Sequence, residues 1–299
     1  MDSYRNKYLP CEAEELDESS MQAIRKQIGE SEESRTRCLQ ILRKDLQSCK
    51  DTHPCLDEDF LLQFLRIAKF DPSKALQKIL RVYQHQDKLA EVFSRLSVSI
   101  QKAGNLNHIW ISPYRLENNS LLVIALAGKV DYNVYSFEER MYLDMLFLSE
   151  ISRSPLNALC GVTFIADYAG FNRRTFFEHT PRRIKLLVES MTGFPHRIKG
   201  YHVVNHPPVF SVLINIAYPF FPKKIRDRLF LHPNDNWKTL HSHVPADILP
   251  EQYGGKLKQS SLINVFENIP ELDEHYRRQM QFGSVRNRHL RQSMRVISA

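Results

Sequence analysis

Residues 121–166 read LLVIALAGKV DYNVYSFEER MYLDMLFLSE ISRSPLNALC GVTFIA, and they set the architecture of the chain. LLVIALA at 121–127 is a continuous apolar run, which is typical of a strand covered on both faces. Ser136 and Glu139 form a capping box that predicts a helix to about residue 151. GVTFIA at 161–166 is a second strand. Strand, helix and strand at this spacing predict a right-handed βαβ unit with parallel strands.

The same alternation continues toward the C-terminus. Thr180 and Pro181 start a helix that Gly193 ends. IKGYHVV at 198–204 then predicts a strand, and it is followed by an apolar helix near 208–217, a short basic helix near 222–228 and a strand LFLH at 229–232. We therefore expect an α/β fold with a mostly parallel sheet and flanking helices.

The sequence before this region predicts helices. Apolar residues recur at i, i+3 and i+7 in two segments, and Asp71 followed by Pro72 is a strong helix start. Residues 1–95 are expected to form a small all-helical N-terminal lobe. At the other end, residues 277–299 hold six arginines and no acid, which predicts a solvated basic tail.

Composition excludes several classes of protein. The chain has 299 residues and a net charge of +7, as expected of a globular domain. The five cysteines are odd in number and form no Cys-x-x-Cys, so we expect reduced thiols: Cys11, Cys38, Cys49, Cys55 and Cys160. The N-terminus contains no apolar signal region, and the longest apolar runs are shorter than the roughly 18 residues of a spanning helix. A cytoplasmic protein is expected.

Enzyme signatures are absent from the sequence, since there is no nucleophile elbow, phosphate loop, dinucleotide fingerprint or zinc-protease motif. We therefore expect no enzymatic activity and no cofactor. His241 and His243 have no acidic or cysteine partner nearby, so no metal site is predicted. For Asp167, at the end of a strand, and for His202 and His206, we favour turn and packing roles.

Three features suggest binding. Residues 207–221, PPVFSVLINIAYPFF, leave almost no polar face on a helix, so core, a bound lipid or a bilayer must cover them. Arg197 and Lys199 share a face of a strand, and Lys224 and Arg228 are four apart on a helix, so the four cations could converge on a phosphate headgroup or stay a solvated surface. The third feature is a mixed helix face that suits either a cavity wall or a locally satisfied core, formed by Tyr142, Met145 and Ser149.

Five separated segments resemble the CRAL-TRIO lipid-transfer family, in that family's order. They are DEDFLLQFLRIAKFD (57–71), FIADYAGF (164–171), FPHRIKGYHVVNHPPVF (194–210), FFPKKIRDRLFLHPND (220–235) and ILPEQYGG (248–255). The similarity is greatest to the branch of the α-tocopherol transfer protein, retinaldehyde-binding protein and clavesins. It implies a lipid-binding domain at 96–258, after the 1–95 lobe and before a C-terminal extension at 259–299.

The resemblance also implies roles for particular residues. A lipid cavity would be lined by Tyr142, Met145, Ser149, Phe164 and Ala166. A mobile gate helix would present Val209, Phe210, Leu213, Ile214 and Ala217. A phosphoinositide headgroup would be held by Arg197, Lys199, Lys224 and Arg228. One departure of this sequence from the family is at Ala68, next to Lys69, where relatives carry a further basic residue.

These implications lead to one expected function and one alternative. The chain is expected to be a monomeric carrier of a hydrophobic retinoid-like or tocopherol-like lipid, without an enzymatic step or a nucleic-acid partner, that associates transiently with endosomal or other anionic membranes containing phosphoinositides. The alternative is a trafficking adaptor that binds phosphoinositides and transfers no lipid.

Overall fold

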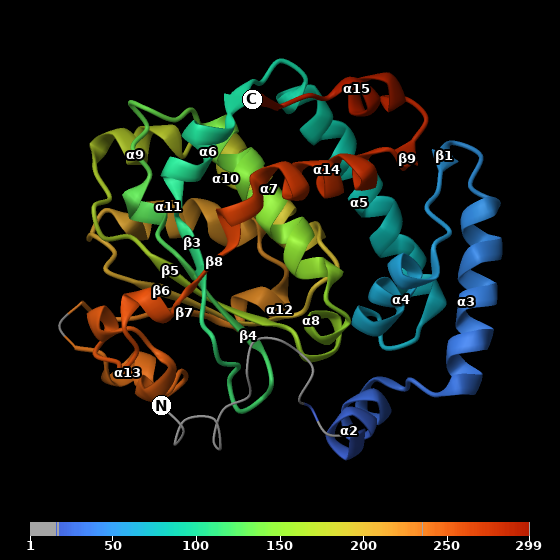
Figure 1. Ribbon diagram of the computed structural model, residues 1–299, viewed down its shortest axis with the longest axis horizontal. Coiled ribbons are helices and arrows are strands. Elements are labelled where there is room, and N and C mark those ends of the chain that lie inside the picture. The colour runs from blue at the N-terminus through green and yellow to red at the C-terminus, as the bar shows by residue number, and fades with distance from the viewer. Residues whose placement is uncertain (1–15, 17, 235, 299) are drawn as a thin grey trace.

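The computed structural model describes residue 16 and residues 18–234 and 236–298. Cys11 and the first part of the predicted N-terminal lobe lie outside the described residues. The centre of the molecule is a six-stranded sheet in the order β7-β6-β5-β4-β3-β8 (Figure 1). Its strands are β3 (Ile109–Ile111), β4 (Leu121–Ala125), β5 (Val162–Asp167), β6 (Ile198–Val204), β7 (Leu229–Leu231) and β8 (Ile263–Asn264).

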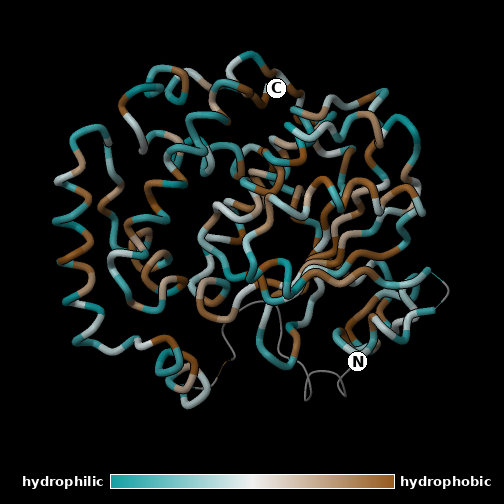
Figure 2. Tube along the Cα trace, turned by 180° about the vertical axis from the view of Figure 1, so that it is seen from behind, coloured by the Kyte–Doolittle hydropathy of each residue, from teal (hydrophilic) through white to brown (hydrophobic). Residues whose placement is uncertain are grey.

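Strands β4 to β7 are parallel, and β3 is antiparallel to both β4 and β8. The predicted α/β class with a mostly parallel sheet is therefore confirmed. Along β4, Leu121 and Val123 belong to the core on one face of the sheet, and Leu122 and Ile124 belong to the core on the other. Figure 2 shows the strands as an apolar band inside the molecule. Both faces of the sheet are covered, which explains why the strands are apolar throughout.

Helices α7 (Phe137–Arg153), α10 (Pro181–Gly193) and α11 (Phe210–Ala217) cover the first face (Figure 1). The capping box of Ser136 and Glu139 and the cap at Thr180 start α7 and α10 as the sequence predicted. Shorter helical elements connect these layers: η2 (Ala127–Lys129), α8 (Pro155–Cys160), α9 (Arg173–Glu178), η3 (Tyr218–Phe220) and α12 (Lys223–Arg226).

The second face packs against the segment after β7. This segment contains α13 (Lys238–His241), η4 (Ala246–Ile248), η5 (Glu251–Tyr253) and η6 (Gln259–Ser261). Tyr253, which is fully buried, donates its hydroxyl to Asp167 at 2.7 Å. The other oxygen of Asp167 accepts the N–H of Ala169 at 2.8 Å, so the turn role expected of Asp167 is confirmed.

Helices α2 (Glu18–Ile28), α3 (Glu32–Gln47), α4 (Glu58–Ile67) and α5 (Pro72–Phe93) form the N-terminal part of the molecule, at the right of Figure 1. Their apolar stripes share a core with Leu156, Leu159 and Cys160 of α8, which attaches them to the part of the chain that contains the six-stranded sheet. A buried ion pair of Arg66 and Glu30, at 2.8 Å, also lies in this region. Two-residue strands β1 (Thr52–His53) and β2 (Val98–Ser99), and helix α6 (Ile100–Leu106), complete the described part before β3.

The expectation of a solvated basic tail at 277–299 is wrong for the residues described. After η7 (Val265–Asn268), the chain forms α14 (Ile269–Met280), β9 (Gly283–Ser284), α15 (Arg288–Ser293) and β10 (Ile297–Ser298). Strand β9 pairs with β1, and β10 pairs with β2. Met280, Met294 and Val296 are buried among the basic residues. The prediction from net charge failed because it overlooked these apolar positions, which pack in the core.

Candidate functional site

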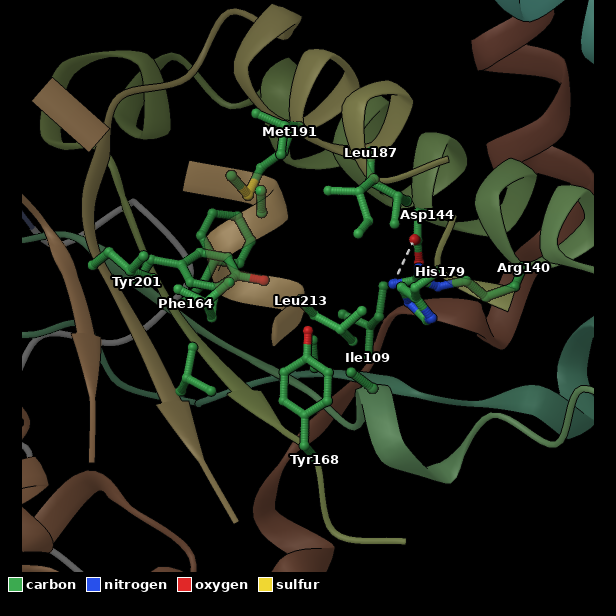
Figure 3. Close-up of a pocket in the computed structure, with 18 of the residues that line it drawn as sticks. Ile109, Arg140, Asp144, Phe164, Tyr168, His179, Leu187, Met191, Tyr201 and Leu213 are labelled. Carbon is green, nitrogen blue, oxygen red and sulfur yellow. Dashed lines mark ion pairs between the residues drawn. The ribbon is translucent and has the colours of Figure 1, made fainter. Parts of the chain in front are cut away.

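A cavity of about 170 Å³ lies between the sheet and helices α7, α10 and α11 (Figure 3). Strands β4, β5 and β6 supply its floor through side chains on one face of the sheet, including Val123, Phe164 and Val203. Helix α10 contributes Ile184, Leu187, Val188 and Met191, at the spacing that the sequence pattern predicted. The lining is mostly apolar, so the cavity suits a hydrophobic guest.

Helix α11 covers the cavity with one face. Phe210, Leu213, Ile214 and Ala217 point toward the cavity and belong to its lining. Val212 lies on the outer face and is 45% exposed. Helix α11 is therefore apolar on both faces. Its inner face lines the cavity, whereas its outer face is exposed to solvent although it is apolar. Val209 precedes the helix as its N-cap and is exposed, so the structure does not place it against the cavity.

An aromatic cluster holds the N-terminal end of α11 in this position. The ring of Phe210 lies 4.2 Å from that of Tyr168 and 6.2 Å from that of Phe171, between ring centroids. Tyr168 and Phe171 belong to the loop after β5. This loop and α11 are separate segments of the chain, so movement of α11 away from the sheet would separate these rings.

The structure separates the five residues expected to line the cavity. Met145 and Phe164 lie in the lining. Tyr142 and Ser149 do not, because they lie on another face of α7 and bond to α14: Tyr142 donates to Asp273 at 2.5 Å, and Ser149 donates to Gln279 at 2.9 Å. Ala166 is buried on β5, but its short side chain is not part of the lining.

Sequence reasoning missed a group of polar residues in the lining. Arg140 and Asp144, four apart on α7, form an ion pair at 2.9 Å that Figure 3 shows at one side of the cavity. The second oxygen of Asp144 lies 2.7 Å from Nε2 of the fully buried His108. Burial lowers the pKa of His108, so its ring is neutral near pH 7. The signal available in the sequence was a pair of opposite charges spaced i, i+4 among the apolar residues of a predicted helix.

Two tyrosines and a histidine face the same space. Figure 3 shows the hydroxyls of Tyr168 and Tyr201 pointing into the cavity from below and from the side opposite Arg140. His179 also lines the cavity, and its Nδ1 lies 2.6 Å from the carbonyl oxygen of Thr175. Burial lowers the pKa of His179 to about 4, so this ring is neutral as well.

The four basic residues expected at a headgroup site lie close enough to repel one another. Burial, and then the charges of Arg197 and Arg228, lower the pKa of Lys199. Burial, and then the charges of Arg228 and Arg197, lower the pKa of Lys224. We call Lys69, Arg197, Lys199, Lys224 and Arg228 the basic cluster. Across the residues that the structure describes, none of the five forms an ion pair with an acidic group.

Backbone contacts hold the two arginines of the cluster. Arg197 donates to the carbonyl oxygen of Leu159 at 3.1 Å, and Arg228 donates to that of Ile198. Helix α12 ends at Arg226, so Arg228 follows the helix instead of lying on it as expected. Gly161 has a φ of +89°, and a Cβ there would lie 2.4 Å from the carbonyl oxygen of Arg197. Only glycine lets the start of β5 approach the basic end of β6 this closely.

Lys69 belongs to the cluster, whereas Ala68 beside it is buried. The charge of Lys69 contributes to lowering the pKa of both Lys199 and Lys224. Lys69 and Phe70 have φ values of 55° and 56°, in the left-handed region, at the end of α4. Position 68 itself therefore adds no charge, and the next residue along the chain supplies a positive charge to the cluster.

The remaining candidate residues do not form a further site. Nδ1 of His202 lies 2.9 Å from Nε2 of His232, and the His202 ring stacks on Phe230, which confirms its packing role. His241 bonds to the carbonyl oxygen of Tyr253. Within the described residues, no group of three or more His, Cys, Asp or Glu side chains is arranged to hold a metal ion. None of the helices in this part of the chain is long and apolar enough to span a bilayer.

Comparisons with known proteins agree with this geometry. A family model described as the CRAL/TRIO domain matches residues 108–255. Alpha-tocopherol transfer protein-like from Mus musculus is 31% identical over 246 residues, which cover 80% of this chain and 71% of that protein, and the Homo sapiens protein gives the same values. Clavesin-1 from Mus musculus is 28% identical over 73% of this chain and 64% of its own length.

The fold has a counterpart among solved structures. The crystal structure of Sfh5 aligns with a TM-score of 0.52 over 84% of this chain and 98% of that chain, at 13% sequence identity. The five segments noted in the sequence, the matched family model and the identity to tocopherol transfer protein-like relatives point the same way. The chain therefore belongs to the CRAL/TRIO domain family.

Proposed function

We propose that this protein is a carrier that takes up a hydrophobic lipid of the retinoid or tocopherol kind in the cavity beneath α11 and delivers it to membranes containing phosphoinositides. The observation that carries the proposal is the largely apolar cavity closed by a helix that is apolar on both faces. The family and the names of its relatives support lipid binding and transfer in general. Burial of roughly 400 Å² of apolar ligand surface would contribute about 10 kcal/mol before ordering costs.

Helix α11 is the proposed gate. Its inner side chains would contact the guest, and Val209, Val212 and Tyr218 would contact the membrane interface when the helix swings outward, since all three are exposed. The contacts of α11 favour this role, because Phe210 is held by a tilted contact with the ring of Tyr168 and an edge-to-face contact with that of Phe171, both in a loop. The guanidinium of Arg226 in α12 lies over the ring of Tyr218, 5.1 Å from its centroid, and a basic residue beside an exposed aromatic ring suits an anionic membrane surface.

The basic cluster is the proposed headgroup site. Five cations without acidic partners repel one another, and a phosphorylated headgroup would relieve this repulsion and accept several charge-assisted hydrogen bonds. Arg197 directly precedes strand β6 and Lys199 lies near its start, and Tyr201 and Val203 of the cavity lining follow within the same strand. A headgroup bound here would thus contact the strand that supports the lipid.

Filling the cavity should abolish transfer. Val203 on β6 is fully buried and lines the cavity, so Val203→Trp places an indole in the space of the guest. We expect the rate of retinol transfer between vesicles, followed by retinol fluorescence, to fall at least tenfold while the circular dichroism melt stays cooperative. Val134→Trp is the matched control, because Val134 is 55% exposed and lies outside the lining. Transfer by Val203→Trp at the wild-type rate would contradict the carrier function.

Removing two lysines of the basic cluster should weaken membrane binding. We expect Lys199→Ala with Lys224→Ala to reduce affinity for vesicles containing phosphatidylinositol bisphosphate by about 2 kcal/mol, roughly 30-fold, in a co-sedimentation assay. Binding of retinol in solution should be unaffected. Lys223→Ala with Lys258→Ala removes two exposed lysines outside the cluster and serves as the control. Equal losses in the two double variants would argue against a headgroup site.

The adaptor alternative gives a different combination of results. If the wild-type protein bound these vesicles through the basic cluster and moved no retinol or tocopherol between membranes, the adaptor function would replace the carrier function.

A further inference from the structure

We propose that the polar end of the cavity, formed by Arg140, Asp144, Tyr168, His179 and Tyr201, selects lipids whose head is an uncharged hydroxyl over the same lipids carrying a carboxylate. The inference rests on the proposed function, because it requires a lipid guest in this cavity. It adds the residues that discriminate between guests and the chemical property that they read.

The charges at the polar end are already balanced. Arg140 and Asp144 pair at 2.9 Å, and their side chains are 14% and 13% exposed. The second oxygen of Asp144 is occupied by His108 at 2.7 Å. His108 and His179 are both neutral, since burial lowers the pKa of each. The group therefore has no net charge, and a ligand carboxylate would add a buried negative charge beside Asp144 without a free cation to pair with it.

Hydrogen-bonding capacity at the polar end is left unused. The hydroxyls of Tyr168 and Tyr201 point into the cavity, and neither bonds to any residue that the structure describes (Figure 3). Nε of Arg140 is buried and lacks a hydrogen-bond partner in the same described part of the chain. Burial raises the pKa of Tyr201 to about 12, so its hydroxyl keeps its proton near neutral pH.

These unused groups match one kind of ligand oxygen. Nδ1–H of neutral His179 donates to the carbonyl oxygen of Thr175, which leaves Nε2 as an acceptor. Two tyrosine hydroxyls can donate or accept, and Nε–H of Arg140 can donate. A ligand hydroxyl, which both donates and accepts, satisfies them without adding charge. A buried polar group left without a partner costs free energy, so a guest that supplies this oxygen is favoured over one that is purely apolar.

Matched pairs of ligands test the inference. We expect the wild-type protein to bind retinol at least tenfold more tightly than retinoic acid, and tocopherol more tightly than tocopherol hemisuccinate. Isothermal titration calorimetry gives each Kd. Tyr168→Phe with Tyr201→Phe keeps both rings and removes both hydroxyls, so the affinity for retinol should fall about tenfold while that for retinoic acid changes little. Tyr114→Phe is the control and should keep the wild-type ratio, because Tyr114 packs against the core on the other face of the sheet and lies outside the lining.

A charge variant tests the balance from the other direction. Asp144→Asn leaves the cation of Arg140 without a carboxylate, so the preference should move toward retinoic acid. The selection inference is overturned if the wild-type protein binds the acid and the alcohol equally, or if the double tyrosine variant keeps the wild-type ratio. If the wild-type protein binds no member of either pair, the carrier function itself fails, and the inference fails with it.

Discussion

Arg291→Met is expected to lower the free energy of unfolding by about 3–5 kcal/mol, the range found when one partner of a buried ion pair is removed. Arg291 lies in α15, in the segment whose composition predicted a solvated tail, and its side chain is fully buried. Its guanidinium pairs with Asp87 of α5. Methionine retains most of the apolar volume, so the loss would report the missing charge and hydrogen bonds more than a cavity.

The guanidinium joins three parts of the chain. Besides Asp87, Arg291 donates to the carbonyl oxygens of Met280, at the end of α14, and Ser284, in β9. Gly283 has a φ of +130°, which favours glycine, and a Cβ there would crowd the guanidinium carbon at 3.3 Å. One side chain therefore fastens the C-terminal extension to the N-terminal helices, and its removal leaves a carboxylate and two carbonyls without this donor.

The matched control is Arg295→Met, four residues further along. Arg295 is exposed and donates only to carbonyls of its own segment, so its replacement should change the free energy by less than about 0.5 kcal/mol. Asp87→Leu combined with Arg291→Met removes both charges and should recover part of the loss. Urea unfolding measures all three variants. An Arg291→Met protein as stable as Arg295→Met would show that the extension is not held by this contact.

Local signals explain why most of the fold could be predicted. The caps at Asp71, Ser136 and Thr180 act within one helical turn, so each marks the start of a helix locally. The strands are continuous apolar runs that differ clearly from the segments on either side. Together these signals predicted the α/β class, which is confirmed. The basic cluster was also visible in part, because Arg197 and Lys199 are two residues apart at the predicted start of one strand. Lys69 could not be placed with them from sequence, since it comes from the N-terminal helices through a left-handed turn.

Contacts with the extension explain what sequence reasoning got wrong. Tyr142 and Ser149 satisfy their hydroxyls on Asp273 and Gln279, 131 and 130 residues away, in a helix that composition assigned to a separate part of the chain. With that partner unknown, their polar groups fitted either a cavity wall or a locally satisfied core, and the family resemblance implied the cavity wall. The wall is formed by another face of α7, where Arg140 and Asp144 lie. The periodicity of a helix identifies its faces, but which face meets which neighbour depends on the tertiary fold.

The free energy of unfolding is expected to fall by several kcal/mol between about pH 7 and about pH 5. The cause is a set of buried neutral histidines. Burial lowers the pKa of His85, His179 and His196 to about 4 and that of His202 to about 3. In the unfolded chain each would have an ordinary pKa of about 6.5, so the unfolded state takes up protons first as the pH falls.

The direction of the effect follows from this difference in proton uptake. Above pH 6.5 neither state is protonated, and the stability from burying neutral rings is complete. Below pH 6.5 each histidine costs up to about 1.4 kcal/mol per pH unit, until the folded state is protonated near pH 4. Carboxylates do not account for this window. Arg35 lowers the pKa of Glu58, and Lys74 lowers that of Asp71, so these groups act at lower pH still.

His196→Phe separates the histidine effect from general acid unfolding. His196 is buried between Phe194 and Phe164, with ring centroids 6.5 Å and 6.1 Å away, so an apolar ring suits its surroundings. The variant should lose about 1–2 kcal/mol less than the wild-type protein between about pH 7 and about pH 5, measured by urea unfolding at each pH. His289→Phe replaces an exposed histidine and should keep the wild-type slope. If His196 contributes to the acid destabilisation, its removal must lower the number of protons taken up on unfolding. A wild-type dependence of the free energy of unfolding on pH in His196→Phe would therefore show that protonation of this ring does not contribute.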